Sequence, residues 1–136
     1  GYNNSWVNID GSKMQSVSGG GHSGGGLFIS TEDHARFGLL FLNKGKWKTH
    51  QLISPEWIKK ATTPSVANPS YGYLWWLNHK ESSRYVAAAG EDMYYAAGFG
   101  GNFIIIIPKE NMVVVTRWLE PKAMPSFLEK VMDATK

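Results

Sequence analysis

Two unbroken apolar runs constrain the fold of this chain more than any other feature of its sequence. Residues 103–107 and 112–115 are continuous and rich in β-branched side chains, and the segment between them, Pro108 to Asn111, is typical of a turn. The two runs are therefore expected to form an antiparallel hairpin. A strand that is apolar along its whole length needs cover on both faces, so we expect helices on both sides of the sheet.

Helical signals lie on both sides of this hairpin in the sequence. The first predicted helix follows Ser30, a suitable N-cap, and ends before Gly45, while the second lies between Ser54 and Pro64. A short C-terminal helix is expected from Ser126, because apolar residues after it recur at helical spacing. These helices would cover the two faces of the sheet.

Two more strands are expected upstream of the hairpin, in an aromatic segment with alternating pattern, 71–77, and in a glycine-punctuated segment, 94–101. The predicted fold is α+β, of the α/β sandwich type, with an antiparallel sheet of about four strands backed by helices. A chain of 136 residues fits a single domain, 1–136. Within it, residues 1–26 are predicted to be a glycine-rich loop region with short extended pieces, and residues 27–136 to hold the helices and the sheet.

Composition excludes several functional classes. The 14 basic and 11 acidic side chains give a net charge of +3, and the basic ones are scattered, which favours a solvated surface over nucleic-acid binding. The chain has no cysteine, and its 4 histidines show no metal-binding spacing, so neither a metal nor a cofactor is expected. No run is long enough to span a membrane, and no signal peptide precedes Gly1.

Two glycine motifs occur near the N-terminus. Residues 21–25 match G-x-S-x-G, which in an α/β-hydrolase would make Ser23 a nucleophile, but no strong strand precedes them. A lone G-x-G-x-x-G match over residues 19–24 is separated from the next helix by an extended segment, which argues against a dinucleotide site. His22, surrounded by glycines, is expected to be accessible to a ligand.

Adjacent tryptophans mark the aromatic strand. Trp75 and Trp76 should point to opposite faces, which places one ring in the core and the other at a surface or groove. An alternative hypothesis follows from this segment. The chain could be a stand-alone, non-catalytic module that binds through its aromatic strand and its glycine-rich loop.

Taken together, several segments resemble the serine β-lactamase and penicillin-binding protein superfamily, in particular its class C-like esterases and peptidases. Residues 24–38 are similar to the pattern G-G-G-L-x-S-T-x-x-D-x-A-R-F-G, and residues 51–57 to the segment that follows it. Residues 71–76 resemble the aromatic strand of the family, and residues 97–102 stand where its third active-site motif is expected. The resemblance covers nearly the whole chain, corresponds to roughly the last third of a full-length relative, and implies a partial β-lactamase-like fold.

The resemblance also implies a site, of which this sequence holds only one part. The family uses a Ser on S-x-x-K, a Tyr on Y-x-N and a K-T-G or H-x-G strand. No Ser here is followed by Lys at the third position, and the Y-x-N at residues 2–4 is interpreted as chance. The third motif implies that the Asn102 backbone N–H helps to form an oxyanion hole. The implied substrate-binding residues are Gly98, Phe99, Gly100, Gly101, His22 and Trp75.

The functional hypothesis is therefore the C-terminal portion of a metal-free acyl-transfer hydrolase, inactive without the missing N-terminal catalytic part. Its substrate would be a small ester, amide or β-lactam. Phe99 stands where the family has Lys or His and cannot pair with a substrate carboxylate, which counts against a true penicillinase. Self-association through exposed apolar surface or a sheet edge is expected. Full-length relatives are often periplasmic or associated with the cell envelope.

Overall fold

The computed structural model describes residues 3–7, 13–17 and 26–135, which divide into two units at residue 33. The predicted ligand-accessible His22 and the motif residue Ser23 lie outside the described residues. The first unit ends at Asp33 and the second begins at His34. The assignment of the whole chain to one domain remains a prediction.

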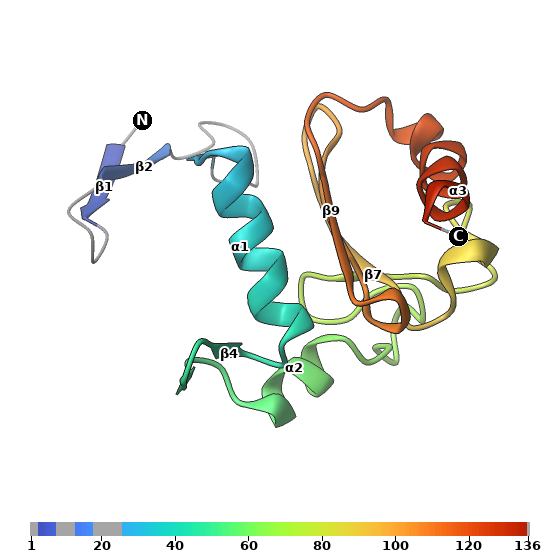
Figure 1. Ribbon diagram of the computed structural model, residues 1–136, viewed down its shortest axis with the longest axis horizontal. Coiled ribbons are helices and arrows are strands. Elements are labelled where there is room, and N and C mark those ends of the chain that lie inside the picture. The colour runs from blue at the N-terminus through green and yellow to red at the C-terminus, as the bar shows by residue number, and fades with distance from the viewer. Residues whose placement is uncertain (1–2, 8–12, 18–25, 136) are drawn as a thin grey trace. The chain divides into compact units, whose positions relative to one another are not determined.

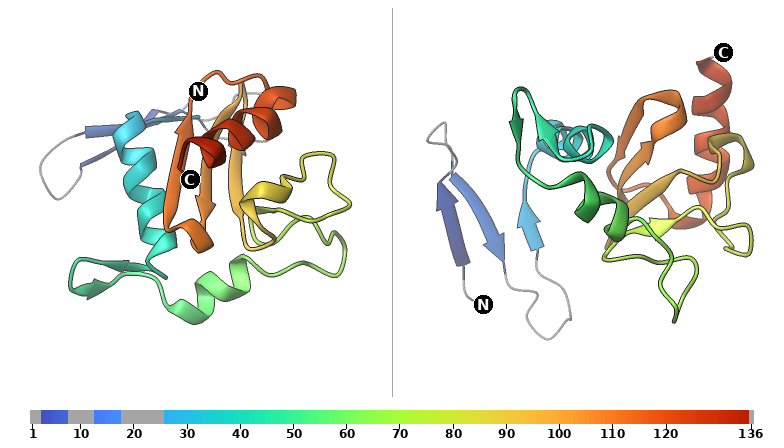
Figure 2. Two further views of the ribbon diagram at one scale, coloured as in Figure 1. Left: turned by 45° about the vertical axis from the view of Figure 1, so that its right-hand side comes forward. Right: turned by 90° about the horizontal axis from the view of Figure 1, so that it is seen from below.

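The first unit is a three-stranded antiparallel sheet in the order β1-β2-β3 (Figure 2). Its strands are β1 (Asn3–Val7), β2 (Lys13–Val17) and β3 (Gly26–Phe28). The predicted loop region is thus more regular than expected, because two five-residue strands replace its short extended pieces. Trp6, Val7 and Val17 lie within these strands, where aromatic and β-branched residues are favoured.

The second unit contains the predicted four-stranded antiparallel sheet, in the order β6-β7-β8-β9. Its strands are β6 (Trp76–Leu77), β7 (Tyr94–Gly98), β8 (Asn102–Ile107) and β9 (Met112–Thr116). The two apolar runs pair in the hairpin β8–β9, with Ile105 opposite Val114. The sheet and its helices confirm the predicted α+β class.

The aromatic segment forms a shorter strand than its alternating pattern predicts. Only β6 pairs with β7, and Tyr71 forms an isolated bridge with Trp76. Between them the chain turns, since the Gly72 N–H donates to the Trp75 carbonyl at 2.9 Å and Leu74 has a φ of 66°. Aromatic alternation does not distinguish a strand from such a turn, which explains the difference.

The described residues form three helices, of which the first two begin and end largely as the capping signals predict. The helices are α1 (Thr31–Leu42), α2 (Pro55–Ala61) and α3 (Met124–Ala134). The third begins two residues before the predicted Ser126, without a side-chain cap. The Ser30 hydroxyl accepts the Asp33 N–H at 3.0 Å, and the Ser54 hydroxyl accepts the Trp57 N–H at 3.1 Å. Short elements connect them: β4 (Lys46–Trp47), β5 (His50–Gln51) and the 3₁₀ turns η1 (Ala87–Ala89), η2 (Pro108–Glu110) and η3 (Pro121–Ala123). Among the described residues, no helix combines the length and the apolar character that crossing a bilayer requires.

The sheet separates two hydrophobic clusters, because successive side chains of β8 point to opposite faces. Phe103, Ile105 and Ile107 are buried with residues of α3, while Ile106 is buried with residues of α1 and α2. Figure 1 shows α3 on one side of the strands and α1 on the other. The prediction that helices cover both faces is therefore confirmed. Each fully buried side chain of this size stabilises the fold by roughly 1.5–3 kcal/mol.

The outer edge of β9 should mediate self-association. Within the described sheet β9 is the last strand, all five of its residues are partly exposed, and none is charged. Uncharged edge strands readily pair with other chains. We expect Val115→Lys to weaken association in sedimentation experiments by roughly tenfold or more, whereas Val66→Lys, at a fully exposed position, should leave it unchanged. Equal association of both variants would exclude this edge.

The largely buried Tyr94 side chain should make the fold less stable at alkaline pH. Burial, with a smaller contribution from the carboxylate of Asp92, raises the pKa of Tyr94 from 10.0 to about 12. The unfolded chain therefore loses this proton first, so the stabilisation is complete below pH 10 and is lost as the pH rises toward 12. Urea titrations at increasing pH should show a shallower loss for Tyr94→Phe than for the exposed Tyr73→Phe control. Identical slopes for the two variants would contradict this account.

Candidate functional site

The predicted third-motif residues lie at the turn between β7 and β8. Gly98 ends β7 and is in register with Asn102, the first residue of β8, so that Phe99, Gly100 and Gly101 form the turn. Gly100 and Gly101 have φ values of 76° and 73°. Glycine is the residue that adopts this left-handed region at little cost. The backbone conformation of the turn therefore explains why residues 100 and 101 are both glycine.

The same two glycines also pack closely against the chain that leaves β9. A Cβ added at Gly100 would lie 2.6 Å from the Trp118 ring, and one at Gly101 only 1.6 Å from the Leu119 carbonyl oxygen. The Leu119 N–H donates to the Gly101 carbonyl at 3.1 Å. Gly98 differs, because a Cβ there would have its nearest contact at 3.5 Å. Of the three glycines, Gly98 is therefore the one that the fold itself does not require.

Asn102 lies within the hairpin. Its side-chain amide donates to the Phe99 carbonyl at 2.6 Å, and its side-chain oxygen is buried without a hydrogen-bond partner among the described residues. The Gly101 carbonyl faces Leu119, and main-chain groups alternate in direction along an antiparallel strand, so the Asn102 main chain faces β7. A role for the Asn102 N–H in an oxyanion hole remains a prediction.

The outer edge of β7 is open near the turn. Among the described strands, β6 pairs only with Tyr94 and Tyr95, which leaves Ala96 to Gly98 without a partner on that edge. Ala97 and Gly98 are exposed, and the Phe99 side chain at the tip is 99% exposed. This end of β7 therefore offers accessible main chain and one accessible aromatic ring.

A groove of about 640 Å³ lies beside β7 and is lined in part by Trp75, a substrate-binding residue that the family resemblance implies. Trp75 is only 4% exposed, and its ring centroid lies 4.5 Å from that of Phe41 and 5.2 Å from that of Tyr94. It thus borders the groove as a buried side chain, while Trp76 packs against the other cluster. The residues lining the groove are Phe37, Phe41, Trp57, Ala61, Tyr71, Gly72, Tyr73, Leu74, Trp75 and Ala96.

One strand links the groove to the glycine turn. Ala96 lines the groove, and Gly98 follows two residues later on the same face of β7. Trp75, Ala96 and Gly98 are therefore associated with one side of the sheet. The sequence indicated Trp75 and Gly98 separately as binding residues. It did not show that side chains of α1 and α2 complete a groove beside Trp75.

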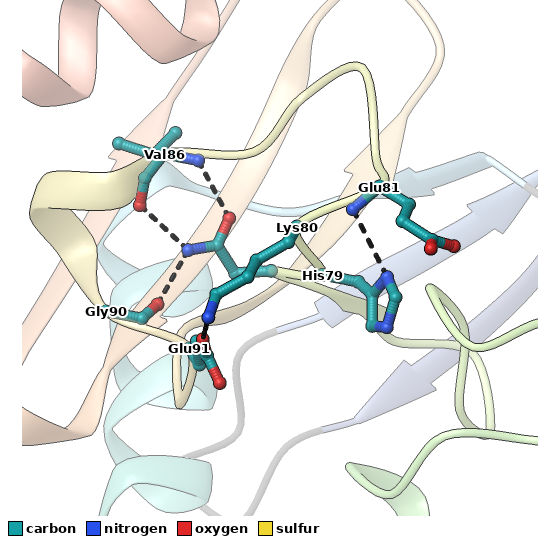
Figure 3. Close-up of polar contacts among 7 residues, drawn as sticks. His79, Lys80, Glu81, Val86, Gly90 and Glu91 are labelled. Atoms are coloured by element: carbon teal, nitrogen blue, oxygen red, sulfur yellow. Dashed lines mark hydrogen bonds and ion pairs between the residues drawn. The ribbon is translucent and has the colours of Figure 1, made fainter.

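A second hollow, of about 620 Å³, was not predicted from the sequence. It adjoins residues 78–81 and 91–94. Figure 3 shows the side chains of His79, Lys80, Glu81 and Glu91. The Lys80 ammonium and the Glu91 carboxylate lie 2.5 Å apart, and their hydrogen bond raises the pKa of Lys80 and lowers that of Glu91. In the part of the chain that the structure describes, no group of three acidic or histidine side chains is placed to hold a metal ion.

Comparisons with known proteins agree with the fold. The sequence model of a family described as Beta-lactamase matches residues 2–118. The chain is 28% identical to "N-acetylmuramyl-L-alanine amidase" of Bacillus subtilis (strain 168) over 85% of its own length and 27% of that protein. It is 29% identical to "Putative D-alanyl-D-alanine carboxypeptidase" of Escherichia coli O157:H7, over 81% of its length and 26% of that protein.

A solved structure is similar as well. "Putative 6-aminohexanoate-dimer hydrolase from Bacillus anthracis" aligns with a TM-score of 0.54 and 25% identity, over 82% of this chain and 28% of that one. The chain thus spans 26–28% of the length of these three relatives.

Proposed function

Because this chain belongs to the beta-lactamase family of hydrolases, we propose that it is the C-terminal segment of a serine hydrolase that cleaves amide bonds by acyl transfer. The family match over residues 2–118 carries the proposal, together with a sequence that contains the third-motif region but no S-x-x-K. In this proposal the segment contributes substrate contacts, and the nucleophile belongs to polypeptide outside residues 1–136.

An amide substrate is favoured by the relatives. Two of them are named as an amidase and a carboxypeptidase, and both names denote cleavage of a bond between a carbonyl carbon and nitrogen. Phe99, in place of the family's Lys or His, provides no cation for a substrate carboxylate at the turn. We therefore favour an amide whose carboxylate, if it has one, is bound elsewhere.

Acyl transfer from an amide requires hydrogen-bond donors for an oxyanion, and in this proposal the segment provides one of them. A serine oxygen adds to the amide carbon, the serine proton passes to a basic side chain, and the carbonyl oxygen becomes an oxyanion. The C–N bond then breaks as the amine takes up a proton, and water hydrolyses the acyl-enzyme. Backbone N–H donors stabilise the oxyanion, and removing one typically lowers the rate by 10²–10³. The Ala97 main chain at the open edge of β7 is the better candidate donor of this segment, because the Asn102 main chain, which the resemblance implies, faces β7.

The first test needs only the encoded reading frame that contains this sequence and a labelling experiment. An S-x-x-K upstream of Gly1 is expected, and the protein that includes it should react with a fluorophosphonate probe and hydrolyse a chromogenic anilide. Residues 1–136 alone should do neither. The absence of that motif from the frame would reject the proposal, as would labelling of any serine in residues 1–136.

Labelling of Ser23 would have a specific meaning. It would restore the interpretation of residues 21–25 as the nucleophile turn of an α/β-hydrolase, which the family match argues against. The non-catalytic binding module is the second candidate function, and the exposed aromatic rings beside the groove favour it. Ligand binding by residues 1–136, combined with a reading frame that lacks S-x-x-K, would support that candidate.

A further inference from the structure

The groove beside β7 has a rim of large apolar side chains that are exposed to solvent. Phe37 is 42% exposed, Trp57 46%, Tyr73 53% and Leu74 81%. Single exposed apolar residues are ordinary, but contiguous ones on a soluble protein mark binding surfaces. None of the residues that line this groove is charged. The groove therefore suits an apolar group.

Leu74 occupies the lip of this groove in an unusual conformation. Its φ of 66° lies in the left-handed region, which branched side chains rarely adopt, and its side chain is mostly in solvent. The turn is fixed at its base, where the Tyr73 N–H donates to the Ala61 carbonyl at 3.0 Å. Gly72 permits this approach, since a Cβ there would lie 2.1 Å from the same oxygen. Backbone strain of this kind is found at ligand contacts, among other functional sites.

A cation stands at the rim. The Lys60 ammonium lies 5.9 Å from the centroid of the Trp57 ring and 5.6 Å from that of Tyr73, within the range of cation–π attraction. Lys60 lines not the groove itself but the neighbouring hollow, together with Lys59 and Glu56 of the same helix, and Tyr73 borders both. The charge at the rim is thus net positive, with two lysines against one glutamate, and complements an anionic ligand group.

We propose that this groove binds an apolar carboxylate, with the alkyl or aryl part between Trp57, Tyr73 and Leu74 and the carboxylate at Lys60. This inference rests on the proposed function in one respect, because it identifies the bound group as part of the amide substrate. It would explain how a hydrolase with Phe99 at its third motif holds an anionic substrate. The carboxylate pairs with α2 and not with the β7–β8 turn.

Binding can be measured on residues 1–136 without any turnover. Trp57 and Trp75 border the groove, so intrinsic fluorescence should report its occupation. N-octanoylglycine should bind saturably, and N-acetylglycine at least tenfold more weakly, because it lacks the long apolar chain. N-octanoylglycinamide, which lacks the carboxylate, should bind about threefold to tenfold more weakly than N-octanoylglycine.

Substitutions separate the two parts of the interaction. Leu74→Ser should weaken N-octanoylglycine binding by about fivefold or more, while Leu52→Ser, a matched change at an exposed leucine outside the groove, should not. Lys60→Gln should remove the preference for the carboxylate over the carboxamide and leave binding of the carboxamide unchanged. Amide NMR spectra would verify that each variant is folded.

The proposal is overturned by several results. These are no saturable binding of N-octanoylglycine, equal affinities for the three probes, or equal effects of Leu74→Ser and Leu52→Ser. A dimer that Leu74→Ser dissociates, without ligand binding, would show that a second copy occupies the groove. Failure of the proposed function looks different, because a frame without S-x-x-K rejects the hydrolase but leaves the measured affinities in place.

Discussion

Asn78→Ala should destabilise the fold by roughly 2–4 kcal/mol, the largest effect we expect from any single polar side chain of the protein. Asn78 is 2% exposed. Its amide nitrogen donates to the carbonyls of Val86 at 2.8 Å and Gly90 at 2.6 Å, and its oxygen accepts the Val86 N–H at 2.9 Å. Alanine would remove all three hydrogen bonds and leave the buried Val86 N–H without a partner, a costly loss. The two carbonyls would keep only their longer bonds, from the Ala89 N–H at 3.2 Å and the Met93 N–H at 3.4 Å.

The effect should reflect burial and not the loss of an asparagine in general. Asn68→Ala is the matched control, because the Asn68 side chain is exposed and accepts only the Ser70 N–H. It should change stability by no more than about 1 kcal/mol.

Asn78→Asp provides a second check, because a carboxylate can accept the Val86 N–H but cannot donate to the two carbonyls. Urea unfolding curves measure all three variants. A stable Asn78→Ala protein would mean that water replaces the side chain.

Gly101→Ala should be the most damaging change at the candidate site, with a loss of about 2 kcal/mol or more. Its φ of 73° disfavours any side chain, and the added Cβ would lie 1.6 Å from the Leu119 carbonyl oxygen. Either the β7–β8 turn or the segment after β9 would have to move. Thermal and urea unfolding should both detect this loss, and near-wild-type stability would show that residues 118–119 shift easily.

Gly98→Ala is the matched control for that experiment. Its Cβ would make only ordinary contacts, the nearest at 3.5 Å, so we expect a stability change within about 0.5 kcal/mol. In the longer hydrolase that we propose, the same two variants can be compared in activity as well as in stability. Loss of activity in a stable Gly98→Ala protein would indicate that substrate approaches the backbone there. Full activity would place the substrate elsewhere.

The fold was predictable where one local signal decides one element. Ser30 and Ser54 start helices because a side-chain oxygen caps the first turn, whatever the helix later packs against. The runs that became β8 and β9 have no polar residue to place in water, so a hairpin covered on both faces was the consistent solution. These features need no knowledge of distant residues.

The sequence was less informative where several segments cooperate. Leucine rarely adopts the left-handed conformation, so the only sign of a turn at Leu74 in the sequence is Gly72, two residues before it. In the sequence, Asn78 stands next to a polar segment and cannot be distinguished from an ordinary loop asparagine. Only the structure shows its three hydrogen bonds to main-chain groups. The groove depends on α1, α2 and the 71–75 turn meeting beside β7, and such a meeting is a property of tertiary structure.

Because β8 belongs to both hydrophobic clusters at once, neither cluster can come apart while the other persists. Phe103 and Ile105 are held by residues of one cluster and Ile106 by residues of the other, yet all three share a single backbone. Heating should therefore melt α2 and α3 in one cooperative transition, although they lie on opposite faces. Amide hydrogens of β8 should exchange only through that global opening, and so more slowly than those of any other strand in the unit.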